Sequence, residues 1–103
     1  MIKGYWIAQV DVTDAEGYKS YIAANAVAFA KYGARFLVRG AVPQVPEGTS
    51  RARVVVIEFP SLQAATECYH SPEYARAKAL RVDHSKADVI LIEGYDGPQP
   101  GVS

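Results

Sequence analysis

Stretches rich in β-branched, aliphatic and aromatic residues alternate along the chain with stretches whose apolar residues recur every three or four positions. The first pattern predicts strands and the second predicts helices. The predicted strands are residues 2–11, 35–40, 51–59 and 86–93. The predicted helices are residues 14–32, 62–70 and 72–82.

Local signals indicate where these helices begin and end. The first helix has a capping-box pattern at Thr13 and Glu16, and Gly33 supplies the left-handed stop that helix ends favour. Ser61 is the expected N-cap of the second helix, and Ser71, followed by proline, is that of the third. The buried stripe expected on the first helix is Tyr18, Ile22, Ala26 and Phe29.

The order of these elements is strand, helix, strand, strand, helix, strand, with the second helical region divided in two. Two βαβ units in tandem predict an α+β fold of the ferredoxin-like type, βαββαβ, with a four-stranded antiparallel sheet. The chain has 103 residues, which is one domain's worth, and we expect that domain over residues 1–94. Residues 95–103 are rich in Gly and Pro and are expected to form an extended or disordered tail.

The strands are apolar on both faces. Two helical regions can cover only one face of a four-stranded sheet, and an uncovered face would alternate apolar with polar residues. Residues 54–57 and 89–92 are instead continuous aliphatic runs. Because soluble monomers rarely expose such a patch, the sequence predicts a two-fold homodimer. The alternative is that the helices of residues 62–82 or the tail fold over the sheet. We expect a ligand site either between the sheets of the two subunits or beneath the helices of residues 62–82.

The charges of the chain balance, with eleven Lys and Arg against eleven Asp and Glu. The chain has no basic excess, which argues against nucleic acid and against an anionic membrane surface as partners. No apolar run approaches the length that spans a bilayer, and the first residues do not resemble a secretory signal. The single cysteine cannot form an intrachain disulfide, so we expect a cytoplasmic protein.

One group of candidate residues lies in the predicted strands. Arg35 and Arg39 share strand parity, and burying two arginines beneath helices would be costly, so we expect both on the face away from the helices. Phe36 and Val38 would then face the helices. If Arg39 and Glu58 share a face, they could bind a substrate carboxylate beside an acid–base glutamate. The alternative is a structural ion pair at the dimer interface.

A second group lies where the two short helices meet. Tyr69, His70, Ser71 and Tyr74 place hydroxyls beside an imidazole, an arrangement that could orient or deprotonate a small substrate. The structural alternative makes Ser71 an N-cap and both tyrosines half-buried core residues. The catalytic candidates are therefore Arg39, Glu58, His70 and Tyr74. The substrate-binding candidates are Gln9, Arg39, Tyr69 and Ser71.

No metal or cofactor is expected. His70 and His84 do not stand at ligand spacing, and Cys68 is the only cysteine that could join them. Cys68 and His70 are two positions apart, which points their side chains away from each other on a helix. Glycine-rich phosphate loops and nucleophile-elbow motifs do not occur.

Five stretches of the sequence together resemble a known family. They are residues 3–7 (KGYWI), 35–40 (RFLVRG), 53–61 (RVVVIEFPS), 68–74 (CYHSPEY) and 92–94 (IEG). The family is the bacterial one known as domain of unknown function 1330, in the dimeric α/β-barrel superfamily. The resemblance extends to Gly94 and implies a ferredoxin-like fold assembled as a dimeric barrel, with Ala41 standing where the family commonly has a second glycine.

The family carries no established activity, so the resemblance transfers no catalytic roles. The residues that match its motif positions are Arg39, Glu58, Tyr69, Ser71, Pro72 and Tyr74. Superfamily relatives include cofactor-free monooxygenases, isomerases and lyases of small acids and aromatic compounds. We therefore expect a metal-free cavity that binds or converts a small anionic or aromatic metabolite. The alternatives are a non-catalytic binding or sensing module and a structural dimer whose cavity is filled by its own side chains.

Overall fold

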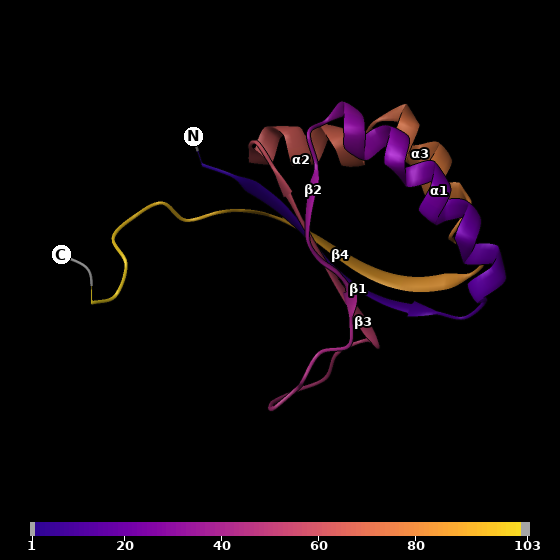
Figure 1. Cartoon of the computed structure of the whole chain (residues 1–103), viewed down its shortest axis with the longest axis horizontal. Helices are drawn as coiled ribbons and strands as arrows, with labels where there is room; N and C mark the ends of the chain where they lie inside the picture. The colour runs from indigo at the N-terminus through magenta and orange to yellow at the C-terminus, as the bar shows by residue number, and fades with distance from the viewer. Residues whose placement is uncertain (1, 102–103) are drawn as a thin grey trace.

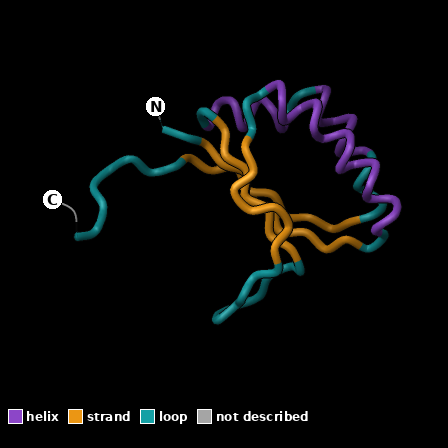
Figure 2. The backbone as a smooth tube through the Cα atoms, viewed as in Figure 1, coloured by secondary structure: helices purple, strands orange, loops and turns teal. Residues whose placement is uncertain are grey.

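Four antiparallel strands form one sheet, and the helices lie together on one face of it (Figures 1 and 2). The computed structural model describes residues 2–101. The strands are β1 (Gly4–Val12), β2 (Arg35–Ala41), β3 (Arg53–Phe59) and β4 (Ser85–Glu93). The helices are α1 (Ala15–Lys31), α2 (Leu62–Tyr69) and α3 (Pro72–Ala79). The sheet order β2-β3-β1-β4 confirms the predicted ferredoxin-like α+β fold.

Serine and aspartate side chains begin the helices. Ser61 Oγ accepts from the backbone N–H of Ala64, and Ser71 Oγ accepts from that of Tyr74, so both predicted N-caps are confirmed. The N-cap of α1 is Asp14, which accepts from the Gly17 N–H, and the predicted capping box at Thr13 was wrong. No residue within 2–101 belongs to a helix long and apolar enough to cross a membrane.

The residues that α1 buries differ in part from the predicted stripe. Its buried residues are Tyr21, Asn25, Ala28 and Phe29. Ile22 and Ala26, predicted to be buried, are exposed. Packing against α3 buries Tyr21, whose hydroxyl lies 2.9 Å from that of Tyr74, whereas Ile22 stays exposed because it lines a space between α1 and the sheet.

Trp6 of β1 lies at the centre of the core. Its ring makes close aromatic contacts with Phe29, Phe59, Tyr69 and Tyr74, at centroid distances of 4.8–5.5 Å. Its indole Nε1 donates a 2.8 Å hydrogen bond to the Ala65 carbonyl of α2. The Trp6 side chain therefore contacts all three helices as well as the neighbouring strand β3.

Residues paired across the sheet form rows, and successive rows alternate between the face toward the helices and the face away from them. One row facing the helices is Phe36, Ile57, Trp6 and Leu91. The next row, on the opposite face, is Val38, Val56, Ile7 and Ile90. We refer to that opposite face as the open face.

Two irregularities in β2 change which residues lie on each face. The register shifts between Phe36 and Val38 and again between Arg39 and Ala41. The first shift inserts an extra residue and reverses parity for Val38 and Arg39, and the second shift restores it at Ala41. Val38 therefore lies on the open face and Arg39 on the helix face, and the predictions for these two residues were wrong. Phe36 faces the helices and Arg35 the open face, as predicted.

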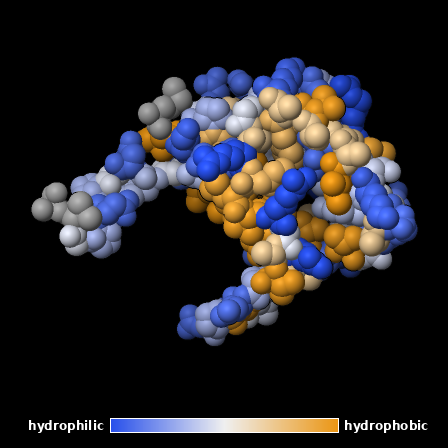
Figure 3. Space-filling view, viewed as in Figure 1, coloured by the Kyte–Doolittle hydropathy of each residue, from blue (hydrophilic) through white to orange (hydrophobic). Residues whose placement is uncertain are grey.

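The middle of the open face is apolar and uncovered within residues 2–101. Ile90 and Ile92 are 54% and 47% exposed there. The loop of residues 42–52 and the segment after β4 project from the body on the side away from the helices (Figure 1). Between them the surface is hollowed and largely hydrophobic (Figure 3). The tail does not cover the face, since Tyr95 is itself exposed. Residues 102–103 of the predicted tail, and Met1 of the predicted domain, lie outside the described residues.

Candidate ligand-binding cleft

A cleft of about 760 Å³ lies between the helix face of the sheet and α1 and α3. Its floor is apolar and comes from alternate residues of the strands, because a strand presents every second side chain to one face. The floor residues are Trp6, Ala8, Val10, Val55, Ile57 and Val89. The wall on α1 includes Tyr18, Ile22 and Phe29. The volume falls within the range of small-molecule sites.

The charged side chains in this lining are all basic. Lys19, Arg39, Arg53 and Arg81 line the cleft, and the described lining contains no Asp or Glu. The chain as a whole has equal numbers of acidic and basic residues. The cleft therefore concentrates positive charge that the composition does not suggest, and such a site favours anions.

Arg39 and Arg53 lie over the β2 and β3 part of the floor. The Arg39 guanidinium stacks on the Phe36 ring, 4.4 Å from its centroid, in a cation–π contact. Arg53 Nη1 donates a 3.1 Å hydrogen bond to the Gly40 carbonyl. Neither makes an ion pair with an acidic side chain within residues 2–101. Both charges remain available to a bound molecule.

A polar group lies where α1 and α3 meet. The Tyr21 and Tyr74 hydroxyls are 2.9 Å apart, and Arg81 Nε donates to the Tyr74 hydroxyl at 3.4 Å. Burial, together with the proximity of Tyr74, raises the pKa of Tyr21 above its ordinary value. Burial likewise raises the pKa of Tyr18. The hydroxyls of Tyr21 and Tyr18 therefore stay protonated at neutral pH and can act as hydrogen-bond donors.

The catalytic candidates separate into two that line the cleft and two that do not. Arg39 and Tyr74 line it. Glu58 lies on the open face, where it pairs in register with Arg35 and accepts a 3.4 Å hydrogen bond from Tyr5. The expected Arg39–Glu58 pair does not form, because the bulge after Phe36 moves Arg39 to the other face. His70 is the exposed C-cap residue of α2 and lies outside the cleft lining.

The substrate-binding candidates other than Arg39 occupy structural positions. Tyr69 packs in the core, and Lys78 donates a 3.2 Å hydrogen bond to its hydroxyl. Ser71 is buried, caps α3 and donates to the Cys68 carbonyl at 2.7 Å. These contacts agree with the structural alternative for the helix junction, in which Ser71 is an N-cap and Tyr69 is a half-buried core residue.

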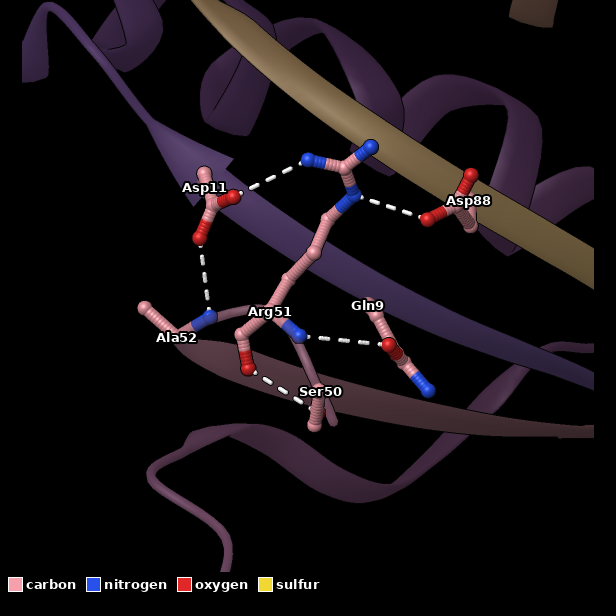
Figure 4. A network of polar contacts seen from close by, with 6 residues as sticks. All are labelled: Gln9, Asp11, Ser50, Arg51, Ala52 and Asp88. Atoms are coloured by element: carbon pink, nitrogen blue, oxygen red, sulfur yellow. Dashed lines mark hydrogen bonds and ion pairs between the residues drawn. The ribbon is translucent and has the colours of Figure 1, made fainter. Parts of the chain in front are cut away.

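Gln9 belongs to a polar network on the open face, at the base of the loop of residues 42–52 (Figure 4). Its Oε1 accepts from the Arg51 N–H at 3.2 Å. Arg51 Nη1 lies 3.0 Å from an oxygen of Asp11, and its Nε lies 2.8 Å from Asp88 (Figure 4). Asp11 also accepts from the Ala52 N–H at 2.8 Å. The network ties the end of the loop to β1 and β4, on the face opposite the cleft.

Sequence reasoning missed Asn25 and Arg81. Both line the cleft and are buried. Asn25 in an alanine-rich helix, four residues after Tyr21, was a readable signal, since positions four apart share a helix face. Arg81 falls within the predicted helix of residues 72–82, but α3 ends at Ala79 and Arg81 lies in the turn that follows. Its position depends on contacts between distant elements.

Clusters of metal-ligating side chains are absent from the described part of the chain. No three His, Cys, Asp or Glu residues within 2–101 gather closely enough to hold a metal ion. Cys68 is fully buried, its Sγ lies 3.8 Å from the Ala28 carbonyl, and burial raises its pKa to about 12. Cys68 is therefore a poor nucleophile.

The sheet order and the helices on one face define a ferredoxin-like α+β protein with a basic cleft beneath the helices. The chain belongs to the family described as Domain of unknown function (DUF1330), whose pattern matches residues 3–95. No curated protein matches the chain.

Solved structures share the fold, and three of them illustrate the likeness. A protein of unknown function from Rhodopseudomonas palustris is 18% identical, with a TM-score of 0.72 over 93% of this chain and 85% of the other. SnoaB, a cofactor-independent oxygenase from Streptomyces nogalater, is 15% identical, with a TM-score of 0.63 over 98% of each chain. A dimeric protein of unknown function and ferredoxin-like fold from Bacteroides fragilis is 15% identical, with a TM-score of 0.53 over 88% of this chain and 95% of the other. At these identities the likeness is one of fold.

Proposed function

We propose that this chain binds a small organic anion with a flat apolar body in the cleft between the sheet and the helices, without a metal. The observation that carries the proposal is the lining, with basic side chains, an apolar floor and no acid among its described residues. An apolar floor holds the body of a ligand by burial, and a few polar groups fix its orientation. The positive field attracts anions from solution and disfavours neutral or cationic competitors.

A reaction on the bound anion is the second part of the proposal. Arg39 and Tyr74 are the catalytic candidates that line the cleft, and they supply a cation and a hydroxyl to a reacting oxygen. Glu58 and His70 have no part in it, because both lie elsewhere. The description of SnoaB as a cofactor-independent oxygenase supports chemistry without a cofactor on this fold. The reaction classes we propose are therefore cofactor-free oxygenation, isomerisation or lysis of a small acid, and the alternative is binding or sensing without turnover.

A binding experiment tests the first part. Native mass spectrometry of freshly purified protein reports any retained ligand, and the fluorescence of Trp6, the only tryptophan, reports occupancy of the cleft it lines. Titration with aryl carboxylates, phenolates and aryl phosphates is expected to change that fluorescence saturably. Ala8→Phe fills the floor and should weaken binding at least about tenfold, since the ring takes the space of the ligand body.

The matched control is Ala23→Phe, at an exposed position of α1 outside the cleft lining, which should bind as the wild type does. Absence of any retained mass and of any saturable response to the whole panel would contradict the proposal. Recovery of a bound ligand chemically unchanged after prolonged incubation would favour the binding alternative over a reaction.

The assembly we propose for this function is a homodimer joined through the open face. A row of aliphatic side chains crosses all the strands there and is uncovered in one chain. A second copy buries such a patch with the fewest additional requirements, because closed two-fold dimers dominate among soluble oligomers. The Bacteroides fragilis protein, which shares the fold, is described as dimeric. The cleft lies on the other side of the sheet, so each subunit keeps its own.

A further inference from the structure

Arg81 is a buried cation whose backbone is held firmly in place. It lies in the turn between α3 and β4 and is 8% exposed. Its own N–H donates to the Lys78 carbonyl at 3.0 Å. Its carbonyl accepts from the His84 N–H and from the Ser85 hydroxyl, each at 2.9 Å. The side chain therefore projects from a fixed backbone toward the cleft it lines.

The charge of Arg81 has no acidic partner within residues 2–101. The one hydrogen bond of its side chain within residues 2–101 is the 3.4 Å contact from Nε to the Tyr74 hydroxyl. The guanidinium carbon lies 5.6 Å from the centre of the Tyr21 ring. The terminal guanidinium nitrogens are not among the buried polar atoms that lack a partner within residues 2–101, so they open onto the cleft that Arg81 lines and can meet an anion there. Both terminal nitrogens of the guanidinium remain free to donate as a planar pair.

Neutral donors surround this cation. The Tyr21 and Tyr74 hydroxyls share one hydrogen bond between them, which leaves the second hydroxyl hydrogen free for another acceptor. Asn25 is 7% exposed and lines the same cleft, and its amide has no hydrogen bond to any other residue within 2–101. Neither α1 nor α3 contributes an Asp or Glu side chain to the described cleft lining. An oxyanion placed beside Arg81 would thus meet several donors and no repelling charge.

Arg39 is the competing candidate for this role. It lies in β2, at one edge of the sheet, whereas Arg81 leads into β4 at the other edge. Arg39 is exposed and already stacked on Phe36. Ion pairs at exposed positions are screened by water and add little affinity, while a buried guanidinium fork binds a planar oxyanion strongly. Arg81 is the better anchor on these grounds.

We propose that Arg81 binds the carboxylate of the ligand in a two-point interaction, with the Tyr74–Tyr21 hydroxyl pair donating to the same group. The proposal rests on the proposed function and narrows its ligand class to monocarboxylates whose flat apolar body lies on Trp6 and Val55. A guanidinium fork pairs with carboxylates and phosphates alike, and we favour a carboxylate because its single negative charge matches the one charge of Arg81 above an apolar floor.

Calorimetry with three ligands that share one aromatic body tests this inference. The ligands are naphthoate, the neutral naphthamide and naphthyl phosphate, and the proteins are the wild type, Arg81→Met, Tyr74→Phe and Arg76→Met. The wild type should prefer naphthoate to each of the others by about tenfold or more. Arg81→Met should lose about tenfold to a hundredfold in naphthoate affinity, with little change for naphthamide. Tyr74→Phe should lose less, because one donor of several is removed. Arg76→Met, an exposed arginine of α3 outside the cleft, is the matched control and should bind as the wild type does.

Urea unfolding of the unliganded proteins separates anchoring from a structural role. Replacing an unpaired buried cation by an apolar side chain of similar length should leave Arg81→Met at least as stable as the wild type. Naphthoate binding by the wild type that Arg81→Met retains in full, or a preference for naphthyl phosphate, would overturn this inference and leave the proposed function standing. Failure of the wild type to bind any of the anions would overturn both.

Discussion

Gly4 of β1 lies directly against the first residue of α2, Leu62. A β-carbon added to Gly4 would lie 2.5 Å from the Leu62 α-carbon and equally close to the Ser61 carbonyl oxygen. These are backbone atoms, which cannot rotate away as a flexible side chain does. The contact places the start of α2 on the end of the central strand β1, next to the hydrogen bond from Trp6 to Ala65.

Gly4→Ala is therefore expected to destabilise the fold. The added methyl forces β1 and α2 apart, and overpacking of this kind costs about 1–3 kcal/mol. The measurement is the urea midpoint followed by circular dichroism. Gly48→Ala is the control, because its φ of +78° carries the left-handed penalty of about 1–2 kcal/mol but a β-carbon there meets nothing within 4 Å. Equal stability of Gly4→Ala and wild type would show that the two backbones separate without loss.

The starts of α2 and α3 and the end of α1 were predictable because their signals are local. Ser61 and Ser71 cap helices through hydrogen bonds to residues three positions on, and Gly33 ends α1 with a φ of +72°. Such interactions need no knowledge of the rest of the chain. The element order, and with it the ferredoxin-like fold, followed from these signals and from the aliphatic runs.

The site was less predictable because two of its determinants are not local. The face of Arg39 depends on a bulge, and the only trace of irregularity in that strand is Gly40, whose φ is +80°. The role of Arg81 depends on Tyr21 and Tyr74, which come from two helices far apart in the sequence. Strand parity predicts faces only while the register is unbroken. A charged residue near the end of a predicted helix gives no sign that tertiary contacts will bury it.

Cys68 is expected to be unreactive in the native protein. Its side chain is fully buried and burial raises its pKa to about 12, so almost no thiolate forms near about pH 8, where an exposed cysteine reacts readily. An aromatic disulfide reagent should label the native protein only slowly, at a rate set by opening of the structure. In strong denaturant the same reagent should titrate one thiol per chain. Rapid labelling without denaturant would mean that α2 is far less firmly docked than its contacts indicate.

Ile90→Arg is expected to separate the proposed dimer. Ile90 is 54% exposed on the open face, so an arginine there is solvated in a single chain but buried and unpaired in a dimer. Sedimentation velocity should give a dimer for the wild type and a folded monomer for the variant. Val27→Arg, at an exposed position on the far side of α1, should remain dimeric. A wild-type monomer at micromolar concentration, with normal circular dichroism, would rule out assembly through this face.

Asp11 is expected to contribute stability that depends on pH. The Ala52 N–H and then Arg51 hold the pKa of this carboxyl below its ordinary value of 3.8. A carboxyl whose pKa is lower in the folded than in the unfolded chain stabilises the fold above its unfolded pKa, and the contribution is lost as pH falls through its folded pKa. The Asp11 contribution is therefore fully present at about pH 7 and declines below about pH 4.

Asp11→Asn tests this dependence, because the amide oxygen can still accept from the Ala52 N–H but carries no charge for Arg51. The variant should unfold at lower urea than the wild type at neutral pH, and the gap between the two midpoints should narrow as the pH is lowered from about 5 toward 3. Asp83→Asn removes an exposed carboxyl for which residues 2–101 supply no hydrogen bond, so its midpoint should follow that of the wild type at each pH. Equal midpoints for Asp11→Asn and the wild type at neutral pH would mean that the hydrogen bond from Ala52, which the variant retains, holds the loop of residues 42–52 to β1 without the ionised carboxylate.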